Sequence, residues 1–139
     1  GVPTAAYITN PDVGMTDRVI VVEGAKKAIV TYQNIGYKSH RMCVVGVPSK
    51  TPAFHILETF QNCSAVYLCL DPDAYVPTKT KNVKIVQPSV YRVANRIGID
   101  RAWLVELPVK ADDFFMMGGD MHSFFRYIRL ARRIEEGPG

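Results

Sequence analysis

The sequence has no long apolar run, few cysteines and only a small excess of charge of one sign. No stretch of eighteen or more apolar residues occurs, so the sequence predicts no membrane-spanning helix. No basic segment followed by an apolar one marks a secretory signal at the N-terminus. Lysine and arginine total 17 against 13 aspartates and glutamates, a net charge of +4, which is compatible with a polyanionic partner but does not require one. We expect an intracellular protein, from a cytoplasm, a nucleoid or a virus-infected cell, with no membrane partner.

The three cysteines, Cys43, Cys63 and Cys69, are an odd number and lie in or beside apolar segments. Buried, reduced thiols of an intracellular protein are typical of this pattern. A zinc site needs paired cysteines or histidines at short spacing. His40 and Cys43 form the only such pair, and no second pair completes a site. The sequence therefore predicts buried thiols and no zinc site.

What the sequence does contain is an average globular composition, with 139 residues, 47% of them apolar and 22% charged. That length suffices for one domain with its own core. Because the chain begins at Gly1 rather than at a methionine, we expect a domain excised from a larger protein.

Four short segments rich in β-branched residues are expected to be strands. Their apolarity is nearly continuous rather than alternating, which is typical of parallel strands covered on both faces. The predicted strands are Arg18 to Val22, Met42 to Val47, Ala65 to Leu70 and Ala102 to Leu107.

Helices are expected between these strands, each with capping or stop residues at its ends. They are Ala25 to Asn34 closed by Gly36, Pro52 to Gln61 capped by Thr51, and Ser89 to Ile97 capped by Ser89 and stopped by Gly98. Strands that alternate with helices predict an α/β fold with a mostly parallel sheet of about four strands, flanked by helices.

Two regions depart from this alternation. Tyr75 to Pro88 carries prolines and lysines and is expected to be either a loop or an added edge strand. Asp120 to Glu136 has helical apolar spacing, with arginines 126, 129 and 133 on another face. We therefore divide the chain into a lead-in segment (1–17), an α/β domain (18–119) and a C-terminal amphipathic helix and tail (120–139). Phenylalanines 114, 115, 124 and 125 are expected to pack in the core rather than to stack on bases.

Acidic residues recur where the predicted strands end. Glu23 and Gly24 end the first, Asp71 and Asp73 the third, and Glu106 the fourth, after which Asp112 and Asp113 follow. Ligands of open parallel sheets bind at the carboxyl ends of the strands. Asp71 and Asp73 are two residues apart, so on an extended segment both would leave the same face and could hold one hard cation.

Each of these acids also has a simpler interpretation. Asp112 or Asp113 could cap a short turn, Asp71-Pro72-Asp73 could be a turn motif, and Glu23 could be a solvated strand end. It is much less frequent for all three simpler interpretations to hold at once, at the ends of predicted strands, than for any one of them to hold. The pattern therefore favours a shared site.

Three motifs, taken in order, resemble the topoisomerase–primase (Toprim) domain. They are Val19-Ile-Val-Val-Glu23-Gly24-Ala-Lys-Lys-Ala28 before a helix, and Leu70-Asp71-Pro-Asp73 after a later strand. The third, Leu107-Pro108-Val-Lys110-Ala-Asp112-Asp113-Phe114, is similar to a stretch of the primase branch. The resemblance covers about Arg18 to Phe115.

This resemblance implies a compact, Rossmann-like α/β fold that binds Mg²⁺ or Mn²⁺ through Asp71 and Asp73. It implies that Glu23 is a catalytic acid or base, or a further metal ligand. Nucleotidyl transfer for primer synthesis in DNA replication would follow, with a single-stranded DNA template, nucleotides and other domains of a replication protein as partners. Lys110 would face phosphate or nucleic acid, as would Lys26 and Lys27 unless they are solvated surface lysines, and Asp112 and Asp113 would be further acids.

The sequence also departs from the Toprim pattern after Asp73. Ala74-Tyr75-Val-Pro77 stands where a small or acidic residue and a glycine usually lead directly into a helix. An altered or lost activity is therefore an alternative, as is a chain that binds metal but does not polymerise alone.

Two other function classes stay open. One is a Toprim nuclease or topoisomerase-type strand cleaver, although Tyr7, Tyr32 and Tyr37 have no context that suggests a nucleophile. The other is a non-catalytic module that binds nucleic acid or protein, for which lysines 79, 81 and 84 and the arginines of the tail would serve.

Overall fold

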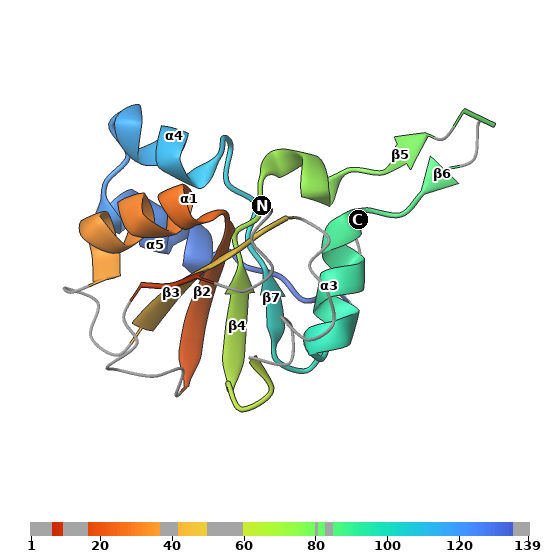
Figure 1. Cartoon of the computed structure of the whole chain (residues 1–139), viewed down its shortest axis with the longest axis horizontal. Coiled ribbons are helices and arrows are strands. Elements are labelled where there is room, and N and C mark those ends of the chain that lie inside the picture. Colours follow the sequence, from red (N-terminus) through yellow and green to blue (C-terminus); the bar gives the residue numbers. More distant parts are fainter. Residues whose placement is uncertain are drawn as a thin grey trace.

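A computed structural model of the chain describes residues 7–9, 17–36, 42–49, 60–79, 81–82 and 85–134. Within them, five strands form one sheet of order β1-β3-β2-β4-β7 (Figure 1). Strands β2, β3, β4 and β7 run parallel, and β1 pairs with β3 in the antiparallel sense. The strands are β1 (Tyr7–Ile8), β2 (Arg18–Glu23), β3 (Met42–Val47), β4 (Ala65–Leu68) and β7 (Ala102–Leu104). The predicted α/β class and its four parallel strands are confirmed, and the lead-in segment adds the edge strand β1.

Both faces of the sheet are buried, as the continuous apolar runs predicted. Along β2, Val19 and Val21 pack into the core on one face, whereas Ile20 and Val22 pack into the core on the other. All four side chains are almost completely inaccessible to solvent. This alternation is the two-residue period of a strand with a hydrophobic layer on each side.

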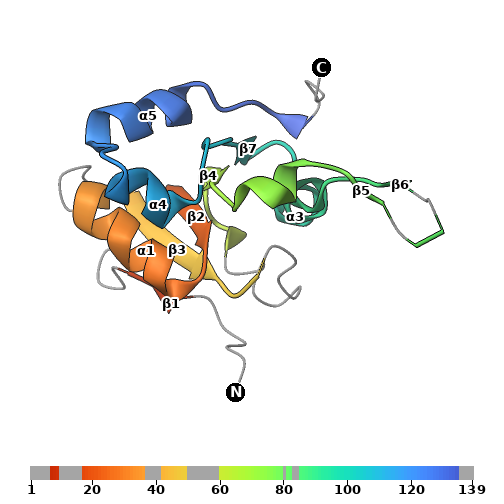
Figure 2. The ribbon, with the colours of Figure 1, turned by 90° about the horizontal axis from the view of Figure 1, so that it is seen from above.

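The helices divide between these two faces (Figure 2). One face is covered by α1 (Ala25–Thr31), α4 (Ala111–Met116) and α5 (Met121–Arg129), and the other by α3 (Ser89–Ile97). Helix α3 has the predicted bounds, and it starts from Pro88 with no side-chain cap, so Ser89 does not cap it. After Thr31, α1 continues as a π-helical turn, Tyr32–Gly36. The predicted helix Pro52 to Gln61 lies outside the described residues except for its last two.

The C-terminal helix is shorter than the apolar pattern predicted. It runs from Met121 to Arg129 and is capped by Asp120, which exchanges hydrogen bonds with Ser123. The chain then turns back, and Arg132 exchanges two backbone hydrogen bonds of 2.8 and 3.1 Å with Leu104 of β7. The prediction that Arg133 shares a helix face with Arg126 and Arg129 is therefore wrong. Arg133 follows the end of the helix, and its guanidinium group stacks 4.1 Å from the Trp103 ring centroid.

The predicted core packing of the phenylalanines and the cysteines is confirmed. Phe114 and Phe124 are buried, and Phe115 and Phe125 are partly buried against the same core. The three cysteines are buried thiols. No helix in the described ranges is long and apolar enough to cross a membrane.

The segment after Asp73 forms a projection from the body of the domain. It comprises the short 3₁₀ helix η3 (Pro72–Tyr75) and a small hairpin of β5 (Thr78–Lys79) and β6 (Ile85–Val86). Figure 1 shows the hairpin extending away from the main sheet. The alternative of an added edge strand is therefore wrong, and the segment is a loop that carries its own hairpin.

Candidate metal centre

The carboxyl ends of β2 and β4 lie side by side at the middle of the sheet. After β2 the chain enters α1 on one face of the sheet, whereas after β4 it reaches α3 on the other face. Two neighbouring strands whose connections leave to opposite faces open a crevice between them, and ligands of open α/β sheets bind there. Glu23 ends β2, and Asp71 follows β4.

Two glycines allow the turn after Glu23, for different reasons. Gly24 has a φ of 87°, a left-handed conformation that glycine adopts without strain. Its N–H donates a 2.6 Å hydrogen bond to the carbonyl of Val47, which holds the turn against β3. A Cβ on Gly46 of β3 would lie only 2.5 Å from the Gly24 carbonyl oxygen, so this close approach requires glycine. Sequence reasoning missed Gly46, although a glycine inside an apolar strand is itself a signal of close approach.

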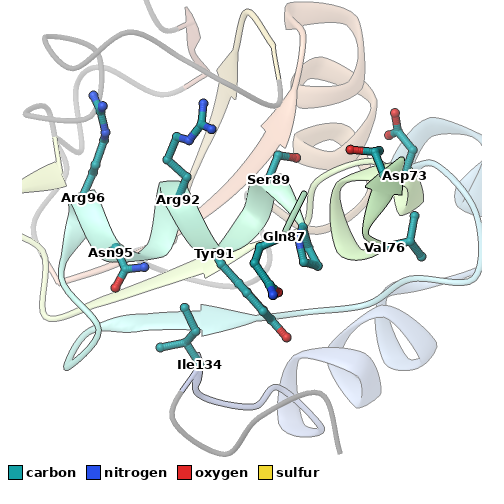
Figure 3. Close-up of a pocket in the computed structure, with 11 residues that line it drawn as sticks. Asp73, Val76, Gln87, Ser89, Tyr91, Arg92, Asn95, Arg96 and Ile134 are labelled. Carbon is teal, nitrogen blue, oxygen red and sulfur yellow. The ribbon is translucent and has the colours of Figure 1, made fainter. Parts of the chain in front are cut away.

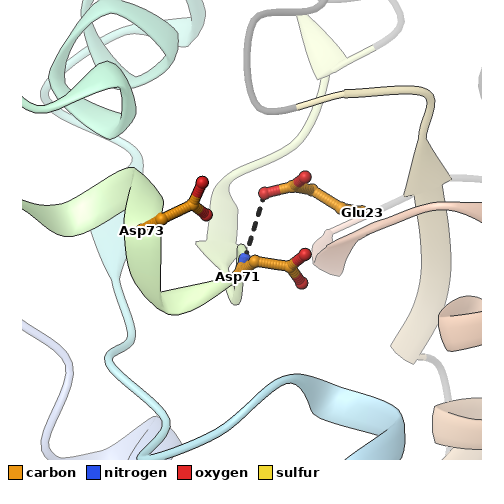
Figure 4. A group of neighbouring side chains, drawn as sticks. All are labelled: Glu23, Asp71 and Asp73. Carbon is orange, nitrogen blue, oxygen red and sulfur yellow. Dashed lines mark hydrogen bonds between the residues drawn. The ribbon is translucent and has the colours of Figure 1, made fainter.

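Glu23 and Asp71 are joined directly. The backbone N–H of Asp71 donates a 3.1 Å hydrogen bond to Oε1 of Glu23 (Figure 4). This bond connects the end of β2 to the segment after β4 and fixes where the Glu23 carboxylate lies. A glutamate that is anchored to a neighbouring backbone is no longer a freely solvated strand end.

The Asp71 side chain is buried, with only 9% of the residue exposed. Its Oδ2 lies 3.2 Å from the ammonium nitrogen of Lys27 on α1. Its Oδ1 is buried without a hydrogen-bond partner in the described part of the chain. An unpartnered carboxylate oxygen in the interior is costly, so such an atom calls for an explanation, and a bound cation is one.

Asp73 is placed in the site by a backbone conformation that the sequence did not predict. Asp71 is extended, with φ −61° and ψ 149°, but Asp73 lies within the helical turn η3 and is exposed. The predicted extended geometry of Asp71-Pro72-Asp73 is therefore wrong. Even so, one oxygen from each of Glu23, Asp71 and Asp73 lies within 4.8 Å of the others, so the predicted proximity of the three carboxylates is confirmed.

This spacing fits a hard cation. Two ligands on opposite sides of an Mg²⁺ ion are about 4 Å apart, so a small side-chain rotation would bring all three oxygens onto one ion. Carboxylate oxygens are the ligands that Mg²⁺ and Mn²⁺ accept. The buried, unpartnered Oδ1 of Asp71 adds a site where a cation would restore the missing interaction.

The other predicted acids do not join this cluster, which comprises three acids among the residues that the structure describes. Glu106 pairs instead with Arg132 at 3.1 Å. Asp112 is buried in α4, and Asp113 lies exposed in the wall of the pocket beside the cluster. Neither caps α4 with its side chain, because that helix starts from Lys110 without a side-chain cap.

The environment raises the pKa of Glu23 above its ordinary value of 4.5. Partial burial is the main cause, and the negative charges of Asp71 and Asp73 add to it, whereas the Asp71 N–H and the Lys27 ammonium act in the opposite direction. Glu23 therefore retains a proton to a higher pH than an exposed glutamate does. Such a shift is typical of carboxylates that exchange protons at functional sites.

Tyr75 holds the segment after Asp71 against the end of β4. Its hydroxyl donates to the carbonyl of Leu68 and accepts a 3.0 Å hydrogen bond from the N–H of Leu70. Because Leu70 is bonded in this way, β4 ends at Leu68 rather than at the predicted Leu70. Burial is the main cause that raises the pKa of the Tyr75 hydroxyl well above its usual value. Sequence reasoning treated Tyr75 only as a departure from the Toprim pattern and missed this role.

An open pocket of about 690 Å³ adjoins the three acids. It lies at the carboxyl ends of all four parallel strands, and Lys110 belongs to its wall. The other predicted phosphate-binding residues lie differently, because Lys27 is paired with Asp71 and Lys26 is exposed on α1. The described lining residues are Glu23, Pro48, Ser49, Asp71, Pro72, Asp73, Pro108, Val109, Lys110 and Asp113.

Comparisons of the chain with protein-family models, with curated proteins and with solved structures gave no match.

Proposed function

We propose that this chain is the Toprim-like catalytic core of a DNA primase or primase–helicase and supports Mg²⁺-dependent nucleotidyl transfer for primer synthesis. The observation that carries the proposal is the meeting of Glu23, Asp71 and Asp73 within 4.8 Å of one another. The resemblance of the surrounding motifs to Toprim primases supplies the reaction class, and a single-stranded DNA template and nucleotides are the implied substrates.

Asp71 and Asp73 are the proposed ligands of Mg²⁺ or Mn²⁺, and Glu23 is the third carboxylate within reach. A bound divalent ion supplies neutralisation of phosphate charge and a fixed orientation for in-line displacement. Among the described residues, Oδ1 of Asp71 has no hydrogen-bond partner to give up, whereas Oδ2 is already engaged by Lys27. Asp71 can therefore gain a cation at one oxygen and keep Lys27 at the other.

Glu23 is the proposed acid or base. Its Oε1 accepts the N–H of Asp71, which leaves Oε2 to take the proton of the 3′-hydroxyl as that oxygen attacks the α-phosphate of the nucleotide and pyrophosphate leaves. The raised pKa of Glu23 supports this role, because a base is most effective when its pKa lies near the working pH. Lys110, in the wall of the same pocket, suits a phosphate group that enters from solvent.

Binding of Mn²⁺, measured by electron paramagnetic resonance, tests the metal site. We expect Asp71→Asn and Glu23→Gln to weaken binding at least tenfold, and Asp100→Asn, an exposed acid outside the pocket lining, to leave it unchanged. Equal binding by the wild type and Asp71→Asn would remove the basis of the proposal.

Two reactions then identify the chemistry. Primer synthesis from ribonucleotides on single-stranded DNA is measured in the parent protein with and without Asp71→Asn, and nicking of labelled duplex DNA is measured with Mn²⁺. Synthesis that requires Asp71 supports the proposal. Nicking that requires Asp71 would instead assign strand cleavage, and Mn²⁺ binding without either reaction would assign a non-catalytic module.

A further inference from the structure

A second pocket, of about 610 Å³, lies beside the metal centre and shares Asp73 with it. It is formed between α3 and the segments at the base of the β5–β6 hairpin, which contribute Val76 and Thr78 (Figure 3). Its volume is in the range of pockets that bind small molecules. The motifs that resemble Toprim domains do not include the residues of α3 that line it.

Two arginines distinguish this pocket. Arg92 and Arg96 are four residues apart on α3, so they lie on the same side of the helix, and both are exposed. In Figure 3 their guanidinium groups extend from the same side of α3 as Ser89, and Asp73 lies beyond the start of that helix. Planar guanidinium groups match the oxygens of phosphate in a bidentate way that lysine cannot. Within the described ranges, Arg92 forms no ion pair with a carboxylate, so an internal salt bridge does not explain why an arginine lies at this position.

The lining residues on the other side of α3 have different chemistry (Figure 3). Gln87 and Asn95 present amide groups there, and Ile134 adds an apolar side chain (Figure 3). Amides can both donate to and accept from the edge of a base. A ligand with phosphates at one end and a polar, flat group at the other end matches both sides, and a nucleotide has this shape.

The shared Asp73 makes binding of such a ligand conditional. A carboxylate at the junction of the two pockets repels phosphate, because like charges a few ångströms apart are unfavourable. A divalent ion among Glu23, Asp71 and Asp73 would reverse the local charge and attract the same phosphate. Ion and phosphate would then strengthen one another's binding by the same factor.

We propose that this second pocket binds the incoming nucleotide, with its phosphates between Arg92, Arg96 and the ion-binding side of Asp73, and with its base toward Gln87 and Asn95. The inference rests on the proposed metal centre and deepens the proposed function, because it assigns where the nucleotide substrate lies.

Calorimetric titration with ATP in the presence of Mn²⁺ tests the assignment. The double variant Arg92→Gln/Arg96→Gln is expected to bind ATP about tenfold more weakly or worse, because it loses charge-assisted hydrogen bonds to phosphate. Arg126→Gln/Arg129→Gln changes the charge equally on the exposed surface of α5 and is expected to bind ATP within about twofold of the wild type. Replacing Mn²⁺ by EDTA is expected to weaken ATP binding to the wild type, because without the ion the Asp73 carboxylate repels the phosphates.

Different results would contradict the nucleotide pocket and the proposed metal centre. If Arg92→Gln/Arg96→Gln binds ATP as the wild type does, the nucleotide pocket is wrong, whatever Asp71→Asn does to Mn²⁺. Mn²⁺ binding without ATP is expected to be unchanged in the double variant, which separates the pocket from the metal site. Because both arginines are exposed, the thermal midpoint of the variant should stay near that of the wild type.

A single-stranded 12-mer of thymidylate with a 5′-phosphate, measured by fluorescence anisotropy, distinguishes the other source of phosphate. If the arginine variant loses affinity for the oligonucleotide while it keeps its affinity for ATP, the pocket holds a strand backbone and the nucleotide assignment is overturned. If it loses affinity for ATP with or without an effect on the strand, the assignment stands.

Discussion

The ammonium nitrogen of Lys27 lies 3.2 Å from Oδ2 of Asp71, the acid at the centre of the proposed metal site. Lys27 lies on α1, which follows β2, and Asp71 follows β4, so this ion pair crosses the crevice between the two central strands. Both side chains are largely shielded from solvent. A partly shielded positive charge in this position compensates part of the negative charge of the three acids when no ion is bound.

Lys27→Met should reveal the two opposite effects of that ammonium. Without added ions, we expect the free energy of unfolding to fall by about 2 kcal/mol, because a shielded carboxylate loses its partner. The shift in thermal midpoint on adding Mn²⁺ should be larger in the variant than in the wild type, since the ion no longer meets a neighbouring positive charge. Thermal unfolding with EDTA and with Mn²⁺ measures both, and Lys26→Met is the control because Lys26 is exposed. A smaller Mn²⁺ shift in Lys27→Met would mean that Lys27 assists the ion instead.

Glu23→Gln should change how stability depends on pH. Because burial and the neighbouring acids raise the pKa of Glu23 in the folded chain, its ionisation opposes folding as pH rises from 4.5 through the raised value. Without metal, we expect the variant to be more stable than the wild type at pH 7 and equally stable below about pH 4. Urea unfolding between pH 4 and pH 8 measures this difference. A difference that does not change with pH would show that the Glu23 charge is not the cause.

Added Mn²⁺ should reverse that order at pH 7. The wild type gains stability from an ion that binds only the folded chain, whereas Glu23→Gln lacks one of the three carboxylates. For the same reason Mn²⁺ affinity of the wild type should fall as Glu23 becomes protonated. Titrations with Mn²⁺ at pH 5 and pH 8 measure this, and equal affinities would contradict the placement of Glu23 beside the ion.

Gly46→Ala should damage the site more than Gly24→Ala does. The new Cβ at position 46 would lie 2.5 Å from the Gly24 carbonyl oxygen, so the turn after Glu23 must move, and we expect a loss of about 3 kcal/mol and weaker Mn²⁺ binding. A Cβ at position 24 would meet no described atom within 4 Å and would add only the strain of a positive φ, about 1 kcal/mol. Urea unfolding of the two variants compares them, and equal losses would refute the close-approach argument.

Tyr75→Phe should loosen the segment that carries Asp73. The variant leaves the carbonyl of Leu68 and the N–H of Leu70 without their shared hydroxyl, a loss of about 2 kcal/mol. We expect Mn²⁺ affinity to fall as well, because η3 is no longer held against β4. Tyr7→Phe, in which the ring lies exposed on the edge strand, is the control and should cost less than about 0.5 kcal/mol. Unchanged stability of Tyr75→Phe would show that the hydroxyl does not hold the turn.

The strands were predictable because their signal is local. The segment Val19 to Val22 is short, β-branched and apolar at every position, and all four side chains are buried because the sheet has a hydrophobic layer on each face. The end of α3 was likewise predictable, from Gly98. The end of α5 was not, since the apolar spacing continues beyond Arg129 while the backbone of Arg132 pairs with Leu104.

The acids of the site were predictable as a set but not in their geometry. That Glu23 and Asp71 follow strands is apparent from the sequence, and parallel strands bring such ends to one edge. The helical turn at Asp73, the space made by Gly46 and the hydroxyl contacts of Tyr75 depend on segments that are distant or differently folded. The sequence likewise contained no signal that Glu106 pairs with Arg132 and so lies outside the acid cluster.

By itself, the amino-acid sequence determined the α/β alternation and which residues end each strand, because helix and strand periods are properties of short segments. Only the tertiary structure decided that β2 and β4 are neighbours, that Lys27 meets Asp71, and that Asp73 faces two pockets at once. The physical reason is that these relationships follow from how the strands order themselves when both faces of the sheet are buried together. That order is a property of the whole core, which no short segment encodes.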